Sequence, residues 1–240
     1  MLLDAHELAD KPHVVERIEK ATTRLVTQAI YDFRHEAALI MKEETDDIQD
    51  VGEDITREAL DRMGAPRIDM RLFGKMDYKK AIYVFQPEFA IRQALLIDSK
   101  AETIAGARTA TIQTSQTSMR IRQIRAGREL DETGELPVVI EKDDETYITT
   151  TLFAKYNYDV DPNSNERILH TIIIACLPNG LLQEIYNPDA THDIWLAGRN
   201  AYSRGEAFRV RISFKKLKEK ANWRVQTMYM FPEESFAWDE

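Results

Sequence analysis

Three residues near the middle of the chain have types and a spacing that suit metal-assisted hydrolysis. Asp77 lies in one β-like run, and Asp98 and Lys100 close the next run, directly after the apolar residues 94–97. Side chains alternate between the faces of a strand, so Asp98 and Lys100 point one way and Ser99 points the other. Two carboxylates can hold Mg²⁺, and an ammonium group can orient a water molecule and offset charge in a transition state. A solvent-facing ion pair at a strand end has the same spacing, so the pattern alone leaves both interpretations open.

A second pattern lies in residues 208–215, where apolar and polar residues alternate. Arg209, Arg211 and Lys215 share one face of the predicted strand, and the apolar residues share the other. An arginine fork can bind the O6 and N7 atoms of guanine in a major groove. A half-buried strand with a solvated face would show the same alternation. Further basic residues that suit phosphate contacts surround this strand: Arg199, Arg204, Lys216, Lys218 and Lys220.

The composition is typical of a soluble protein with a sizeable core. The chain has 240 residues, of which 43% are hydrophobic and 30% are charged. It contains no apolar run long enough to span a membrane, and its acidic N-terminal segment does not resemble a secretory signal. The one cysteine, Cys176, cannot form an intramolecular disulfide, so a cytoplasmic location is expected. The net charge of −9 does not itself indicate a nucleic-acid partner, although only the local field in a cleft must be positive.

The hydrophobic pattern predicts one mixed α/β domain without repeats or long linkers. An amphipathic helix is expected over residues 12–45, and a shorter one over 54–64, with Asp54 as N-cap and Gly64 as C-terminal stop. A further helix is expected within 101–126, and loops at 127–137 and 141–145. The remaining pattern predicts strands at 68–85, 92–99, 146–160, 167–178, 206–220 and 222–231.

Several segments together resemble the type II restriction endonucleases of the SfiI/BglI group, in the PD-(D/E)xK nuclease superfamily. The longest, "AGRNAYSRGEAFRVRISFKKLKEKANWRVQ", contains the arginine strand, and "LLIDSKAET" contains Asp98 and Lys100. The resemblance extends over about residues 50–228. It implies a single-domain α/β (α+β) fold over 1–240, with a mixed central β-sheet flanked by helices. Within that domain the hydrophobic periodicity predicts an N-terminal helix (1–45), and the resemblance implies a catalytic hairpin (65–101) and a DNA-recognition region (197–228).

The resemblance also assigns roles to individual residues. Asp77 and Asp98 match the metal-binding carboxylates of the family, and Lys100 matches its catalytic lysine. Arg209 and Arg211 match the arginine pair that reads guanines.

The chain departs from the family's pattern beside the recognition strand. Arg199 matches a family lysine that contacts the recognition site, and Asn200 and Ala201 lack the acidic group that BglI uses there. Because an acidic side chain can accept a hydrogen bond from a cytosine amino group, the identity of at least one base pair stays open. Glu102 could take an acidic base-reading part, and Glu58 could add a carboxylate near the metal.

The activity that the resemblance implies is Mg²⁺-dependent double-strand cleavage of DNA at a GC-rich interrupted palindrome, leaving 3′ overhangs. It further implies a homodimer or homotetramer on double-stranded DNA, no membrane, the cytoplasm of a prokaryote, and a cognate DNA methyltransferase that acts on the same site. Three alternatives are a repair or recombination nuclease of the same fold, a catalytically silent DNA-binding protein, and a scaffolding α/β protein. The bases of the half-site, the spacer length, the number of metal ions and the choice between dimer and tetramer remain open.

Overall fold

The computed structural model describes residues 3–44, 48–64, 67–71, 80–86, 90–106, 108–196 and 208–240, with only the backbone path given for 67–71 and 80–86. Asp77, Arg199 and Arg204 lie outside these residues. No helix in the described ranges is long and apolar enough to cross a membrane. The described α-helices are α1 (Pro12–Asp32), α2 (Arg34–Glu43), α3 (Ile48–Arg62), α4 (Gln183–Tyr186) and α5 (Phe214–Lys220). Short 3₁₀ helices are η1 (Ala5–Leu8), η2 (Ile104–Gly106), η3 (Thr114–Gln116), η4 (Gly180–Leu182) and η5 (Asn222–Arg224).

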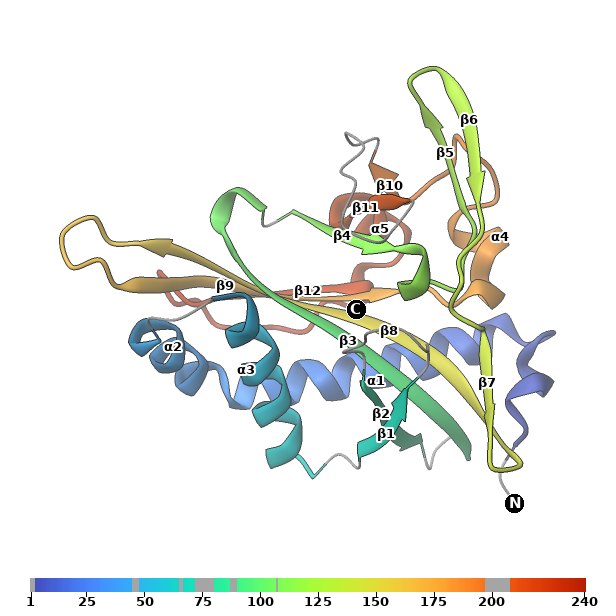
Figure 1. The fold of residues 1–240 in the computed structure, drawn as a ribbon, viewed down its shortest axis with the longest axis horizontal. Helices are drawn as coiled ribbons and strands as arrows, with labels where there is room; N and C mark the ends of the chain where they lie inside the picture. The colour runs from blue at the N-terminus through green and yellow to red at the C-terminus, as the bar shows by residue number, and fades with distance from the viewer. Residues whose placement is uncertain are drawn as a thin grey trace.

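A seven-stranded mixed sheet forms the centre of the fold (Figure 1). The strand order is β1-β2-β3-β8-β9-β12, and β7 pairs with the start of β8. Only the β3–β8 pair is parallel, and the other pairs are antiparallel. With helices packed on this sheet, the predicted fold class is confirmed. The strands are β1 (Arg67–Arg71), β2 (Lys80–Gln86), β3 (Ile91–Thr103), β7 (Val139–Lys142), β8 (Glu145–Val160), β9 (Arg167–Leu177) and β12 (Val225–Tyr229).

Two smaller sheets complete the described strands. A three-stranded sheet has the order β10-β11-β4, and a separate hairpin pairs β5 with β6 and projects from the body of the molecule (Figure 1). Because β4 is an edge strand of its sheet, one of its edges faces away from β11. The strands are β4 (Thr109–Gln113), β5 (Ile121–Arg125), β6 (Arg128–Glu132), β10 (Trp195–Leu196) and β11 (Arg209–Ser213).

The N-terminal helical region is divided where the periodicity predicted one helix over 12–45. The break falls at Phe33, which lies between α1 and α2 and is itself buried. The next helix, α3, begins at Ile48, so Asp54 lies inside it and is not its N-cap. Gly64 follows the helix with φ of +74°, a conformation that favours glycine, which agrees with the predicted stop.

Four of the elements predicted after residue 100 differ from the structure. The expected helix within 101–126 is replaced by the end of β3 and by β4 and β5, and the expected loops at 127–137 and 141–145 contain β6 and part of β7. The expected strand over 206–220 ends at Ser213, whose side chain accepts a hydrogen bond from the Lys216 amide and so caps α5. Lys215 therefore lies on a helix and does not continue the basic face of β11.

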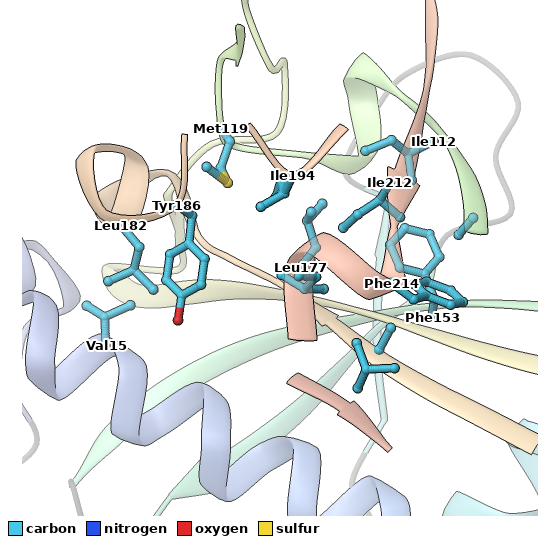
Figure 2. Packing of buried hydrophobic residues seen from close by; sticks show 14 of the residues in the cluster. Val15, Ile112, Met119, Phe153, Leu177, Leu182, Tyr186, Ile194, Ile212 and Phe214 are labelled. Carbon is cyan, nitrogen blue, oxygen red and sulfur yellow. The ribbon is translucent and has the colours of Figure 1, made fainter. Parts of the chain in front are cut away.

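The two faces of the central sheet bury two hydrophobic clusters. On one face, Leu152, Ala154 and Tyr156 of β8 share a buried cluster with residues of α1, α2 and α3. On the other face, Phe153 of β8 shares a cluster with residues of β4, β11 and α5, and Figure 2 shows Phe153 beside Phe214. The alternation along β8 therefore places α2, α3 and the C-terminal half of α1 on one face, and the β10-β11-β4 sheet with α5 on the other.

A buried ion pair joins helix α1, near the start of the sequence, to η5, near its end. Arg224 Nη2 lies 2.7 Å from Glu19 Oε2, and both side chains are fully buried. The second carboxylate oxygen of Glu19 accepts a 2.7 Å hydrogen bond from the Asn179 amide, and the guanidinium also lies over the ring of Tyr186. Burial, together with the charge of Glu19, raises the pKa of the adjacent Cys176 thiol to about 12, so this cysteine is a buried thiol and not a reactive one.

Arg224→Met is expected to lower the free energy of unfolding by about 3–5 kcal/mol, because it leaves the Glu19 carboxylate buried without its counter-charge. Urea denaturation followed by circular dichroism measures the change. The double variant Arg224→Met, Glu19→Met is expected to recover part of that loss, since it removes both charges. A single variant as stable as the wild type would contradict the assigned role of this pair.

Candidate active site

Asp98 and Lys100 lie together near the end of β3, on the face of the sheet that packs against β4. Lys100 Nζ is 3.3 Å from Asp98 Oδ2, and their side chains are 38% and 17% exposed. That Asp98 oxygen is buried and accepts no hydrogen bond from the described residues. A buried carboxylate oxygen without a hydrogen bond is costly, and this one is therefore available to a further cationic ligand.

Ser99 points to the opposite face, as the alternation predicts. Its hydroxyl donates a 2.7 Å hydrogen bond to Thr56 Oγ1 of α3, and Thr56 in turn contacts the Tyr156 hydroxyl at 2.8 Å. Ser99 and Thr56 are both buried. These hydroxyl groups tie α3 to β3 and β8, so Ser99 has a structural role and is not a nucleophile.

Gly52 lets α3 approach the backbone of β3 beside Lys100. A Cβ atom at this position would lie 3.0 Å from the Ala101 nitrogen and 3.1 Å from the Lys100 carbonyl carbon. Any larger residue would press against the backbone of the strand that carries Lys100. Glycine is therefore needed here for close packing, at some cost to helix propensity.

The next residue of α3 brings a further carboxylate close to Asp98. Burial raises the pKa of Glu53, and the negative charges of Asp98, Asp50 and Asp54 raise it further. Glu58, which the sequence suggested as a possible metal-site carboxylate, instead lies near Arg62 at 3.4 Å on an exposed surface. The α3 carboxylate that interacts electrostatically with Asp98 is thus Glu53 and not Glu58. The sequence could have indicated this, because residues five apart in a helix lie on different faces.

The described residues hold only part of the predicted metal site. Among the residues that the structure describes, no three His, Cys, Asp or Glu side chains group closely enough to bind a metal ion. Asp77, the other predicted carboxylate, falls in the segment between β1 and β2 and is outside the described residues.

A second lysine, not predicted from the sequence, lies beside Lys100. Lys155 of β8 is the parallel register partner of Lys100 and is only 2% exposed. Its Nζ donates hydrogen bonds to Glu102 Oε2 at 2.7 Å and to the Thr109 carbonyl oxygen at 2.6 Å. Burial lowers the pKa of Lys155, and the contact with Glu102 opposes that shift. Glu102, suggested by the resemblance as a possible base-reading residue, is thus already engaged by Lys155. The sequence offered one indication of this buried lysine, which is that Lys155 interrupts the apolar residues of the predicted strand 146–160.

The basic face of β11 carries the two predicted recognition arginines. Val210 and Ile212 are buried in the cluster against the central sheet, so Arg209 and Arg211 point away from it. Arg211 is exposed, and Arg209 is partly buried with an Nε atom that has no hydrogen-bond partner among the described residues. Arg199 and Arg204 cannot be placed, because they lie outside the described residues.

The lysines that follow β11 are not part of this basic face. Lys215 is on α5, exposed to solvent, and 3.8 Å from Glu219 one turn away. Lys216 donates to Asp193 and to the Trp195 carbonyl oxygen, and Lys218 donates to Asp239 at 2.5 Å. Lys216 and Lys218, expected as phosphate contacts, therefore form ion pairs within the protein.

Strand β4 connects the two groups of predicted functional residues. Lys100 Nζ lies 3.4 Å from the carbonyl oxygen of Thr111, and Thr111 is the register partner of Arg211 in the β4–β11 pair. The catalytic and recognition candidates come from strands more than a hundred residues apart, and the fold separates them by the width of one strand.

Comparisons with known proteins agree on one family. The family model for the type II restriction enzyme SfiI matches residues 34–228. The curated type II restriction enzyme SfiI of Streptomyces fimbriatus is 30% identical over 228 residues, which cover 90% of this chain and 84% of that protein.

Two solved structures have the same fold. The tetrameric restriction endonuclease SfiI bound to cognate DNA matches with a TM-score of 0.80 and 28% identity, covering 95% of this chain and 88% of that one. The restriction endonuclease BglI bound to its DNA recognition sequence matches with a TM-score of 0.75 over 94% of both chains, and its 18% identity supports the fold alone. From the extent of the family match and of the curated relative, the chain belongs to the SfiI family of type II restriction enzymes.

Proposed function

We propose that this restriction enzyme makes Mg²⁺-dependent double-strand cuts in DNA at a GC-rich interrupted palindrome and leaves 3′ overhangs. The observation that supports it most is that only strand β4 lies between the pair Asp98 and Lys100 and the arginine strand β11. A site-specific nuclease needs a hydrolytic group and a base-reading group at a fixed separation.

Asp98 and Asp77 are proposed to hold the Mg²⁺ ion. The buried oxygen of Asp98 that accepts no hydrogen bond fits a hard cation, which prefers carboxylate oxygens and retains several water molecules. Asp77 lies three residues before β2 begins, and β2 pairs directly with β3. Burial raises the pKa of Glu53, and the charge of Asp98 adds to that shift, so a divalent cation bound here would also reduce the repulsion between these two carboxylates.

Lys100 is proposed to act on the reacting groups. A Mg²⁺ ion held by Asp98 and Asp77 would supply Lewis acidity to the phosphate and would lower the pKa of a water molecule bound to it. The Lys100 ammonium donates hydrogen bonds that orient the attacking water and stabilise negative charge on the phosphoryl oxygens. Water adds to phosphorus, the bond from phosphorus to the 3′ oxygen breaks, and the products are a 5′-phosphate and a 3′-hydroxyl.

Arg209 and Arg211 are proposed to read guanines in the major groove. Both lie on the face of β11 that points away from the buried cluster, and each guanidinium can bind O6 and N7 of one guanine. Arg199 and Arg204 are proposed as supporting DNA contacts. Lys215 is proposed as a phosphate contact only, because it lies on α5 and not on the base-reading face of β11.

The assembly is proposed to be a homodimer or a homotetramer of single-domain chains. A palindromic site requires a two-fold symmetric protein, and the SfiI structure is tetrameric on cognate DNA. A DNA methyltransferase that modifies the same site, and a prokaryotic cytoplasm, belong to the same proposal.

Digestion of a known genome in the presence of Mg²⁺, followed by sequencing of the fragment ends, tests the proposal directly. The expected result is discrete fragments whose ends share one interrupted palindrome and carry 3′ extensions. Random ends would indicate a nuclease without sequence specificity. Specific binding without cleavage in any divalent metal would indicate a silent DNA-binding protein.

Asp98→Ala is expected to abolish cleavage while leaving specific binding measurable in Ca²⁺, because the carboxylate is needed for the metal and not for base reading. Plasmid cleavage and gel-shift assays measure the two properties. Asp98→Asn, which keeps the shape and removes the charge, is expected to be equally inactive. Retained cutting in either variant would remove Asp98 from the metal site.

Arg211→Ala is expected to weaken binding of the cognate duplex by about 1–3 kcal/mol and to weaken binding of random duplex much less. Lys215→Ala removes a positive charge from the adjacent helix and is expected to change both affinities equally. Fluorescence anisotropy at fixed salt provides the comparison. Equal losses on both duplexes for Arg211→Ala would show that this arginine contacts only phosphates.

A further inference from the structure

Lys155 is an unusual residue to find in the central sheet. It is a charged side chain with 2% exposure, between Ala154 and Tyr156 in a strand whose other central residues are largely apolar. Burying an ammonium group costs several kcal/mol unless it is paired and hydrogen-bonded. Lys155 meets this requirement with the Glu102 carboxylate and the Thr109 carbonyl oxygen. The arrangement therefore holds three elements together: β8, the end of β3 and the start of β4.

The two hydrogen bonds matter because of where β4 lies. Its backbone pairs with β11 on one side, where Ser213 faces Thr109 and Arg211 faces Thr111. On its other side, the carbonyl oxygens of Thr109 and Thr111 accept from Lys155 and Lys100 respectively. Carbonyls two residues apart leave a strand along the same edge, so the two lysines hold one edge of β4 while β11 holds the other.

The two lysines differ in how firmly they bind that edge. Lys155 is buried and makes short contacts of 2.6 and 2.7 Å, whereas Lys100 is 38% exposed and lies 3.4 Å from Thr111. Lys155 is thus the fixed attachment of β4, and Lys100 is the weaker contact that can leave the carbonyl for a phosphate. Arg211 and Lys100 thus meet at the same residue of β4, because Thr111 is the register partner of the one and the hydrogen-bond acceptor of the other.

We propose that Lys155, through Glu102 and the Thr109 carbonyl, is a positioning residue that fixes β4 and thereby makes cleavage by Lys100 depend on base recognition by β11. This inference rests on the proposed function of Lys100 and Arg211 and adds a link between them. Lys155 touches neither substrate nor metal in this scheme. Its effect is on how strongly a wrong base pair suppresses the hydrolytic step.

Lys155→Met tests the inference, because methionine fills a similar volume without the charge or the hydrogen bonds. Single-turnover cleavage of the cognate site is expected to fall about 10- to 100-fold, in the range seen when a supporting residue around an active site is lost. We call the cleavage rate at the cognate site divided by the rate at a site with one changed base pair the discrimination ratio. This ratio is expected to fall about tenfold, while the dissociation constant for cognate DNA in Ca²⁺ changes by less than about threefold.

A double-mutant cycle with Arg211→Ala measures the coupling between the two substitutions in the cleavage rate of bound DNA, and a purely structural role of Lys155 would leave that coupling at zero. If Lys155 links the two sites, Arg211→Ala is expected to lower the cleavage rate of bound DNA less in the Lys155→Met background than in the wild type. Additive effects would overturn the link. Glu102→Gln, which keeps a hydrogen-bond acceptor, is expected to shift discrimination in the same direction by a smaller factor and serves if Lys155→Met folds poorly.

Lys216→Met is the matched control, because Lys216 also binds one carboxylate, Asp193, and one backbone carbonyl, that of Trp195 in β10, and neither of these hydrogen bonds goes to β4. It is expected to lower thermal stability without narrowing the discrimination ratio. If Lys216→Met and Lys155→Met lower the discrimination ratio equally, the effect reflects a general loss of stability and the inference is wrong. A wild-type protein that does not cut overturns the proposed function as well, whereas a Lys155→Met variant with wild-type discrimination overturns this inference alone.

Discussion

The parallel register of β3 with β8 is the constraint on which the candidate active site depends. It places Asp98 opposite Phe153 and Lys100 opposite Lys155. A shift of one residue would turn Asp98, Lys100 and Glu102 toward the helices and Ser99 toward β4. Apolar residues of β8 resist such a shift on both faces, since Phe153 is buried on one and Leu152 and Tyr156 on the other. The hydrogen bonds from Ser99 to Thr56 and from Thr56 to Tyr156 reinforce the same register from the helical side.

With that register fixed, the energetic problem is the charge brought onto the sheet. Asp98, Lys100, Glu102 and Lys155 share one face, and their charges balance as two acidic and two basic groups. Pairing opposite charges in this way repays part of the free energy that is lost when these groups leave water, whereas a single buried lysine without a carboxylate would not recover it. The remaining hydrogen-bonding capacity of the lysines goes to the open edge of β4. A sheet edge needs its carbonyls satisfied, and a buried ammonium needs acceptors, so each arrangement stabilises the other.

The sequence predicted the parts of this site that depend on local pattern and missed those that depend on tertiary contact. Alternation placed Asp98 with Lys100 and Arg209 with Arg211, because the period of a strand is a local property. The end of β11 at Ser213 was missed, although serine before a lysine-rich run is a recognisable helix N-cap. Ala126 and Gly127, both with positive φ, form the turn that joins β5 and β6, where a helix and then a loop were expected. The burial of Lys155 could not be predicted, since its acceptors come from β3 and β4.

The negative net charge bears on how such an enzyme selects its site. With a net charge of −9, the protein as a whole repels the phosphate backbone, so attraction to DNA must come from a local positive field. Lys216 and Lys218 are paired with carboxylates and add little to non-specific binding. In the proposed complex, affinity rests on a small number of close contacts, among which bidentate arginine contacts discriminate between bases and phosphate contacts do not. Under the proposed function, non-specific affinity stays low, and the contact of both β11 and Lys100 with β4 links the few specific contacts to cleavage.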